Sequence, residues 1–318
     1  MVMPMEKPML SIYIPTYNHE NYIARALDSV LMQKTQYSYE VLVGEDVSTD
    51  GTRAILQEYE ARFPGKFTMF YREKNMHGSE VSNALDLKRR CRGKYIIALE
   101  GDDFWTDENK LEKQITFLET HPEYLAVAHN CVVVGEDSLP NGEQYPDCKD
   151  EEYTLRHFVS EQMPGQLTTV MCRNYMNEPY MDTSLFERRL SPGDRLLYFA
   201  LAAYGKVFCM QEVMSAYRHI TTHGSSFSAT SRYSFAKDEH WYYELMQYAL
   251  QLTNKTAGKY AQLLYFRSLV QGVKQRQITW CDFRRYLSHI PKKFSTAWLY
   301  LKYFLRHHVL HKELWVSA

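Results

Sequence analysis

The 318-residue sequence lacks several features that would assign it to a special class of protein. No apolar run approaches the ~20 residues that a helix needs to cross a bilayer, and there is no internal repeat or low-complexity segment. The six cysteines are scattered without a Cys-x-x-Cys pair, which argues against a zinc module or a disulfide scaffold. A formal net charge of −1 gives no basic excess, so we expect no nucleic-acid partner. The polar segment Met1–Pro8 does not resemble a signal peptide. These absences predict a soluble, cytoplasmic globular protein.

Short apolar stretches alternate with segments of helical periodicity in the first third of the chain. The apolar stretches predict four strands, at Leu10–Ile14, Tyr39–Val43, Phe67–Tyr71 and Tyr95–Leu99. Strands that alternate with helices at these lengths indicate βαβ units and a mainly parallel sheet with right-handed crossovers. In such a sheet the carboxyl ends of the first, second and fourth strands gather along one edge.

An acidic cluster, Glu100-Gly101-Asp102-Asp103, follows the fourth strand directly. Open α/β sheets bind their ligands at the carboxyl ends of buried strands. Clustered carboxylates repel one another unless a cation or hydrogen bonds compensate them, and Mg²⁺ or Mn²⁺ bridges carboxylates to phosphates. The alternative is an acidic turn before the helix that begins near Asp107, and the cluster alone does not decide between the two.

Polar and aromatic residues also follow the first two strands. Tyr17 can stack on a nucleotide base, and Asp46 can accept hydrogen bonds from a base N–H or from ribose hydroxyls. With the acidic cluster, these residues fit a nucleoside diphosphate. Alternatively, Tyr17 packs on the next helix, and Ser48 and Asp50 cap the helix that begins at Thr52.

The order of these motifs resembles that of family 2 glycosyltransferases. The motifs are Pro15-Thr16-Tyr17-Asn18, Glu45-Asp46-x-Ser48-Thr49-Asp50-Gly51-Thr52, Glu100-Gly101-Asp102-Asp103 and Leu111-Glu112-Lys113-Gln114. The resemblance implies an α/β GT-A fold, a Rossmann-like, mainly parallel mixed sheet flanked by helices. It also implies transfer of a sugar, with inversion, from a nucleoside-diphosphate sugar to a hydroxyl of a glycan or lipid-linked acceptor, in surface polysaccharide synthesis.

The resemblance also implies roles for individual residues. The donor would be bound by Pro15, Thr16, Tyr17, Asn18, Glu45, Asp46, Ser48 and Asp102. Asp102, Asp103 and His223 would hold Mn²⁺ or Mg²⁺, with His219 as the rival of His223 because the spacing around them departs from the family pattern. Val47 stands where the family often has glycine, so we expect this turn to avoid positive φ, which is costly for a β-branched residue.

Residues 1–230 are predicted to form the catalytic domain, with about 1–120 binding the nucleotide sugar and about 121–230 the acceptor. Gln166–Arg173 predicts a strand that the resemblance places at the acceptor site. Asp194 opens a helix, where an acid by itself only favours the macrodipole. Within the resemblance Asp194 is the general base that takes the proton of the acceptor hydroxyl, chosen above Asp182 and Glu187.

Residues 231–318 are predicted to form a C-terminal helical extension, because apolar residues recur there only at helical spacing. The stretch Pro291–Trp315 mixes aromatic and basic residues. We expect it to pack on its own domain with lysines reaching outward. The alternative is peripheral contact with the inner face of a membrane.

Two rival functions stay open. A sugar-nucleotide pyrophosphorylase would carry a glycine-rich phosphate loop with a basic residue after the first strand, where this chain has Pro15–Glu20. A catalytically silent protein on the same scaffold would bind a nucleotide sugar or a carbohydrate without turnover.

Overall fold

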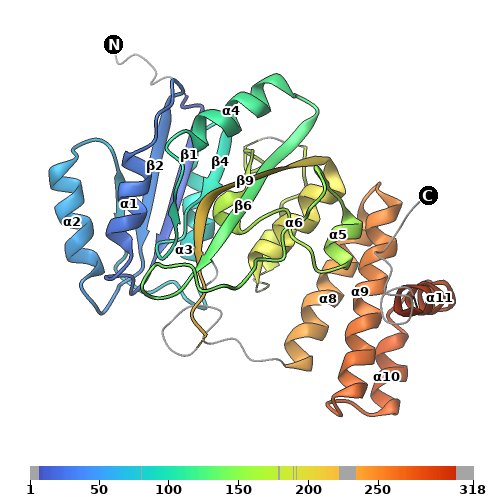
Figure 1. The fold of residues 1–318 in the computed structure, drawn as a ribbon. Helices are drawn as coiled ribbons and strands as arrows, with labels where there is room; N and C mark the ends of the chain where they lie inside the picture. The colour runs from blue at the N-terminus through green and yellow to red at the C-terminus, as the bar shows by residue number, and fades with distance from the viewer. Residues whose placement is uncertain are drawn as a thin grey trace. The chain divides into compact units, whose positions relative to one another are not determined.

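The computed structural model describes residues 7–79, 81–177, 180–188, 190, 192–221 and 234–305, which form parts of two compact units (Figure 1). The first, which we call the sheet unit, comprises residues 1–153, 163–183 and 205–230. The second, the helical unit, comprises residues 154–162, 184–204 and 231–318.

The sheet unit is built on one nine-stranded sheet of order β3-β2-β1-β4-β8-β6-β9-β5, with β7 paired to β9. The strands are β1 (Leu10–Thr16), β2 (Tyr39–Glu45), β3 (Thr68–Tyr71), β4 (Tyr95–Ala98), β5 (Phe104–Trp105), β6 (Tyr124–Val134), β7 (Glu152–Tyr153), β8 (Met171–Arg173) and β9 (Lys206–Arg218). β1 to β4 are parallel, while β8 runs antiparallel to β4 and β6. The sheet is therefore mixed, with a parallel half that contains all four strands predicted from the first third of the sequence.

Four helices belong to this unit: α1 (Ile23–Leu31), α2 (Thr52–Arg62), α3 (Asn83–Arg90) and α4 (Lys110–Thr120). Ile12, Val43 and Ile97 are buried on the central strands, and Leu27 and Leu111 are buried in the same core from α1 and α4. Each such side chain contributes about 1.5–3 kcal/mol on burial. Near-continuous burial along β1 is typical of a parallel strand covered on both faces.

Two stretches of this unit differ from the predictions. The predicted strand Gln166–Arg173 is wrong in its first part, because Leu167–Thr169 forms a 3₁₀ helix (η1) whose Thr168 N–H donates to the Gln166 side chain. Only Met171–Arg173 pairs as a strand. β9 was not predicted, because three exposed residues around Glu212 interrupt its apolar pattern where its register with β6 shifts.

The helical unit contains η2 (Ser184–Arg188) and the helices α5 (Leu155–Val159), α6 (Gly193–Tyr204), α8 (Phe235–Gln251), α9 (Lys255–Lys274), α10 (Trp280–Leu287) and α11 (Lys293–Phe304). α9 is the most buried of them and packs against α5, α8, α10 and α11. The predicted C-terminal helices are therefore present. Their unit also includes residues 154–162 and 184–204, and the division of labour between residues 1–230 and 231–318 stays a prediction. None of the described helices combines the length and the apolar character needed to cross a membrane.

Candidate functional site

The carboxyl ends of three neighbouring strands meet at a pocket of about 350 Å³ in the sheet unit. β1 lies between β2 and β4, with Thr16 opposite Glu45 and Tyr13 opposite Ala98. This register brings the loops that follow the three strands to one edge. Six of the predicted site residues line the pocket: Pro15, Thr16, Tyr17, Asp46, Asp102 and Asp103.

The loops after β1 and β2 are joined by hydrogen bonds from Asn18 and Ser48. The Asn18 N–H donates to Ser48 Oγ (3.0 Å), and Asn18 Oδ1 accepts from the Thr49 N–H (2.8 Å). Asn18 adopts a left-handed φ of 56°, which asparagine tolerates. Asp50 accepts from the N–H of Thr52, the first residue of α2 (3.0 Å), but the N-cap residue of this helix is Gly51, so neither Ser48 nor Asp50 occupies the cap position. Asn18 and Ser48 thus hold the two loops together and are not among the described residues that line the pocket.

The Glu45 side chain stabilises the turn that follows β2. Its side chain is almost fully buried, accepts from the Ser48 N–H and forms an ion pair with Arg53. Arg53 also donates to the Arg72 carbonyl oxygen (2.9 Å). Val47, between these anchors, has a φ of 61°, so the expectation that this turn avoids positive φ is wrong. The strain of about 1–3 kcal/mol is tolerated because the bonds at Asp46 and Ser48 hold the backbone on both sides.

Asp46 is held from three directions at the edge of the pocket. Its N–H donates to the Thr16 carbonyl oxygen (3.1 Å), and its carbonyl oxygen accepts from Asn75 Nδ2 (2.7 Å). Its Oδ1 accepts from the Met76 N–H (2.7 Å). Burial raises the pKa of Asp46, and the Met76 N–H opposes that shift. The carboxylate is therefore fixed in position before any ligand arrives.

The turn that carries the acidic cluster lies close against the loop after β1. A Cβ on Gly101 would lie 2.5 Å from His19 Nδ1 and 2.7 Å from Thr16 Oγ1, so only glycine fits there. His19 Nδ1 contacts Thr16 Oγ1 (3.1 Å), and His19 Nε2 lies 4.0 Å from Asp102 Oδ2. His19 also lines the pocket, and sequence reasoning missed it. Its position directly after the Pro15–Asn18 motif was the available signal.

Asp103 is the most deeply buried acid of the cluster. Its Oδ1 accepts from the Arg218 N–H (2.8 Å), whereas its buried Oδ2 has no hydrogen-bond partner among the described residues. Burial, and then the neighbouring Asp102 carboxylate, raise the pKa of Asp103 well above its usual range. A buried carboxylate oxygen without a partner, beside a second carboxylate, is satisfied by a proton or by a cation.

Arg218, at the end of β9, fastens the acidic turn to the loop after β6. Its Nε donates to the Asp102 carbonyl oxygen (2.8 Å), and one Nη donates to the carbonyl oxygens of Gly135 and Glu136. The guanidinium lies 4.1 Å from the centre of the Tyr22 ring. Burial lowers the pKa of Arg218, but it stays charged because arginine titrates so high. These contacts hold the acidic turn in place.

The profile described as "Glycosyl transferase family 2" matches residues 11–176, just over half of the chain. The chain belongs to this family. The match spans β1 to β8 and includes all three loops that form the pocket. Arg218 and Asp194 lie beyond it, so the family match does not assign them.

Comparisons with individual proteins agree with the assignment to glycosyl transferase family 2. An uncharacterized protein of Mycobacterium tuberculosis is 34% identical over 232 residues, which are 71% of this chain and 63% of that protein. The putative teichuronic acid biosynthesis glycosyltransferase TuaG of Bacillus subtilis is 29% identical over 221 residues, 69% of this chain and 82% of TuaG. The chain thus spans less than two thirds of the first relative and most of the second.

A solved structure supports the fold. The structure of residues 1–349 of S. aureus TarS, in complex with UDP-GlcNAc, superposes with a TM-score of 0.65 at 18% identity and covers 96% of this chain and 88% of that one. The predicted GT-A fold with C-terminal helices is confirmed.

Three residues that the family resemblance singled out are not among the described residues that line the pocket. Asp194 belongs to the helical unit, in the first turn of α6, where its Oδ1 accepts from the Arg195 N–H (2.8 Å). His223 lies outside the described residues. Its rival His219 follows β9, forms an ion pair with Glu143 and stacks on Tyr217. The roles of all three stay predictions.

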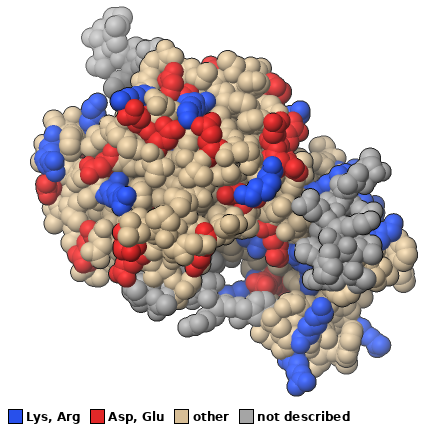
Figure 2. All heavy atoms as spheres, viewed as in Figure 1, with Lys and Arg blue, Asp and Glu red and all other residues tan. Residues whose placement is uncertain are grey.

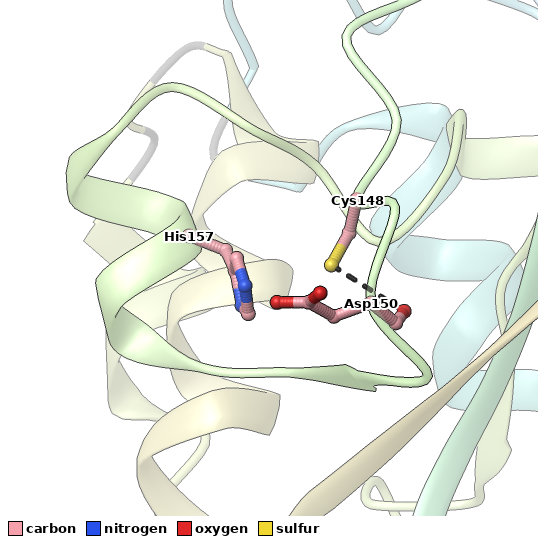
Figure 3. Close-up of side chains that lie close together, drawn as sticks. All are labelled: Cys148, Asp150 and His157. Carbon is pink, nitrogen blue, oxygen red and sulfur yellow. Dashed lines mark hydrogen bonds between the residues drawn. The ribbon is translucent and has the colours of Figure 1, made fainter. Parts of the chain in front are cut away.

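Figure 3 shows Cys148, Asp150 and His157, which together could be taken for a metal site. In the sheet unit, the Cys148 thiol donates to the Asp150 carbonyl oxygen (3.6 Å). In the helical unit, His157 Nδ1 accepts from the Thr154 N–H (3.0 Å) and completes the capping box of α5. Because the Cys148 thiol and His157 Nδ1 already have protein partners, we assign no metal site to this group.

Proposed function

We propose that this protein is an inverting glycosyltransferase. It transfers a sugar from a nucleoside-diphosphate sugar to a hydroxyl of a glycan or lipid-linked saccharide during surface polysaccharide synthesis. The observation that carries the proposal is that Tyr17, Asp46 and Asp102, from three separate strand ends, line one pocket in a family 2 chain. Its volume of about 350 Å³ lies within the usual range of small-molecule sites.

The nucleoside would be recognised by the loops after β1 and β2. Tyr17 offers a ring on which a base stacks, and the buried Asp46 carboxylate accepts hydrogen bonds from a base N–H or from ribose hydroxyls. Asn18, Glu45 and Ser48 act on the donor indirectly, because they hold these two loops in position. The UDP-GlcNAc bound to S. aureus TarS is a reason to test uridine donors first.

Asp102 and Asp103 would hold Mn²⁺ or Mg²⁺, with His223 as a further ligand. The residues fit such an ion, because two adjacent carboxylates meet there and one buried oxygen has no hydrogen-bond partner among the described residues. When bound, the cation neutralises charge on the departing nucleoside diphosphate. Arg218 holds the turn through two hydrogen bonds, one from its N–H to the Asp103 carboxylate and one from its Nε to the Asp102 carbonyl oxygen.

The transfer itself needs one base. The Asp194 carboxylate takes the proton of the acceptor hydroxyl as its oxygen bonds to the anomeric carbon. The bond from that carbon to the diphosphate oxygen breaks at the same time, and the electron pair leaves with the nucleoside diphosphate. Attack opposite the leaving group inverts the configuration.

Donor binding and turnover test the proposal together. Wild type, Asp102→Asn and Asp194→Asn are compared with UDP-, GDP- and dTDP-sugars in Mn²⁺, Mg²⁺ or EDTA. We expect metal-dependent donor binding that Asp102→Asn abolishes, and turnover that Asp194→Asn abolishes while binding survives. Glu108→Gln, an exposed acid that pairs with Lys34, is the control and should change neither.

Two outcomes would contradict the proposal. If no nucleotide sugar binds with any metal, the pocket has been misassigned. If the wild type binds a donor but neither hydrolyses nor transfers it, the chain is a silent binding protein on this scaffold.

A further inference from the structure

Exposed apolar side chains gather on the last two described helices of the helical unit. Among the described residues, eight large apolar side chains are exposed, and five of these lie between residues 280 and 305. The five are Trp280, Phe294, Trp298, Leu301 and Leu305. Phe294 is 93% exposed and Trp298 is 58% exposed. Such clustering on a water-soluble surface marks an interaction site, whereas single exposed apolar residues are ordinary.

α11 carries apolar residues on two opposite faces. Its inner face, which includes Leu299 and Tyr303, is buried where the helix packs on α9. Phe294, Trp298 and Leu301, followed by Leu305, recur at spacings of four, three and four on the outer face. A helix that only covered its own core would carry polar residues there, so the outer face has the composition of a second contact surface.

The segment that carries this stripe is rich in positive charge. Residues 274–305 contain seven lysines and arginines but one acid, Asp282, in a chain whose net charge is −1. Asp282 is already paired with Arg285 (3.1 Å). Lys302 Nζ lies 5.4 Å from the centre of the Trp298 ring, which places a cation beside the apolar stripe. Figure 2 shows Lys and Arg side chains on the surface of these helices, at the lower right.

We propose that this surface, which we call the C-terminal patch, binds bilayers that contain anionic lipids. The patch consists of Trp280, Phe294, Trp298, Leu301 and Leu305 with the flanking Lys292, Lys293 and Lys302. Its aromatic rings enter the headgroup region and its lysines bind lipid phosphates. Bound in this way, the two helices lie in the plane of the membrane surface.

The charge of the patch favours this partner over a second copy of the chain. Self-association through the patch would bring two surfaces of the same strong positive charge together, which is unfavourable. An anionic bilayer matches both properties of the patch at once, since it supplies negative headgroups above an apolar layer.

Vesicle co-sedimentation of the full chain tests the proposal. Vesicles of phosphatidylcholine alone are compared with vesicles that also contain phosphatidylglycerol, at low and at high salt. We expect binding to the mixed vesicles only, weakened by salt. Phe294→Ser with Trp298→Ser should weaken binding about 10-fold or more, and Lys292→Glu with Lys293→Glu about 30-fold or more.

Two matched controls on the sheet unit isolate the patch. Leu139→Ser removes a side chain that is 62% exposed, about as much as Trp298. Lys66→Glu reverses an exposed lysine. Both should bind vesicles as the wild type does. Because the substituted patch residues are exposed, circular dichroism should show that all the variants are folded.

Tryptophan fluorescence gives an independent readout. Lipids brominated in their acyl chains should quench the wild type, and Trp280→Phe with Trp298→Phe should abolish the quenching. The proposal is overturned if the anionic vesicles are not bound, or if patch and control variants bind equally. It is also overturned if the wild type is a dimer that the patch variants dissociate. Vesicle binding uses no nucleotide sugar, so its failure leaves the proposed transferase reaction untouched.

Discussion

Gly101 should be hard to replace, because it lies tightly against the loop after β1. A methyl group at this position would lie 2.5 Å from His19 Nδ1, 2.7 Å from Thr16 Oγ1 and 2.9 Å from Thr16 Cβ. Real Cβ atoms do not approach other atoms so closely, so Gly101→Ala must move the acidic turn away from the loop after β1. That movement separates Asp102 from Thr16 and His19, which also line the pocket.

The size of the effect follows from two opposing contributions. Overpacking of this kind costs about 1–3 kcal/mol. Replacing glycine by alanine also restricts the unfolded chain, which returns about 0.4–1 kcal/mol. We therefore expect Gly101→Ala to lower the free energy of unfolding by about 1–2 kcal/mol. Gly193→Ala is the matched control, because a Cβ there meets no atom within 4 Å, and it should be neutral or slightly stabilising.

Urea denaturation measures the stability of both variants, and titration calorimetry with UDP and Mn²⁺ measures binding at the pocket. Gly101→Ala should weaken UDP binding at least about 10-fold, since the turn carries Asp102 and Asp103. The double variant Gly101→Ala with His19→Ala removes one of the two clashing side chains and should recover part of the lost stability. If Gly101→Ala unfolds and binds as the wild type does, the two loops are not packed as described and the reasoning fails.

Two further predictions concern buried groups and strain in the sheet unit. Burial raises the pKa of Asp147 to about 7, against about 3.9 in an unfolded chain. Between about pH 4 and 7 the Asp147 carboxyl is therefore protonated in the folded protein but ionised in the unfolded chain. The free energy of unfolding should fall as the pH rises through this range, by on the order of 2–4 kcal/mol in total. Asp147→Asn should flatten this dependence in urea denaturation at several pH values, and an unchanged profile would contradict the assignment. Val47→Gly should remove the backbone strain at the positive φ of 61° in the folded protein, but it should also raise the conformational entropy of the unfolded chain. Its stability should therefore stay within about 1 kcal/mol of wild type, and a larger loss would mean that the Val47 side chain itself stabilises the turn.

The sequence alone predicted the parallel half of the sheet because β1, β2 and β4 are apolar and buried along most of their length, although β3 is only partly buried. The same regularity placed the ends of β1, β2 and β4 at one edge, so Tyr17, Asp46 and Asp102 could be expected to meet. The family motifs identified these three residues, but they did not predict the hydrogen bonds and ion pairs that fix the surrounding loops. The role of Glu45 as an anchor for the Val47 turn depends on Arg53, and such a pairing has no sequence signature of its own.

Irregular structure was harder to predict. β9 escaped prediction because its pairing with β6 shifts register where Gln211 and Glu212 are exposed. The 3₁₀ turn η1 is stabilised by local hydrogen bonds to Gln166 from Thr168 and Thr169, which compete with strand formation. His19 was missed because its neighbour Asp102 is distant in sequence and becomes close only through the β1–β4 register.

The bond between Asp103 and Arg218 also constrains the order in which the site is completed during synthesis. The two residues are 115 positions apart, and among the described strands β5, which follows Asp103, pairs with β9 alone. On the ribosome, the loops after β1 and β2 can form long before β9 has emerged. Until β9 emerges, the acidic turn lacks both the hydrogen bond from the Arg218 N–H to Asp103 and the strand that pairs with β5. A chain cut back to the family-matched residues 11–176 would therefore retain the nucleoside side of the pocket and lose the finished acidic turn.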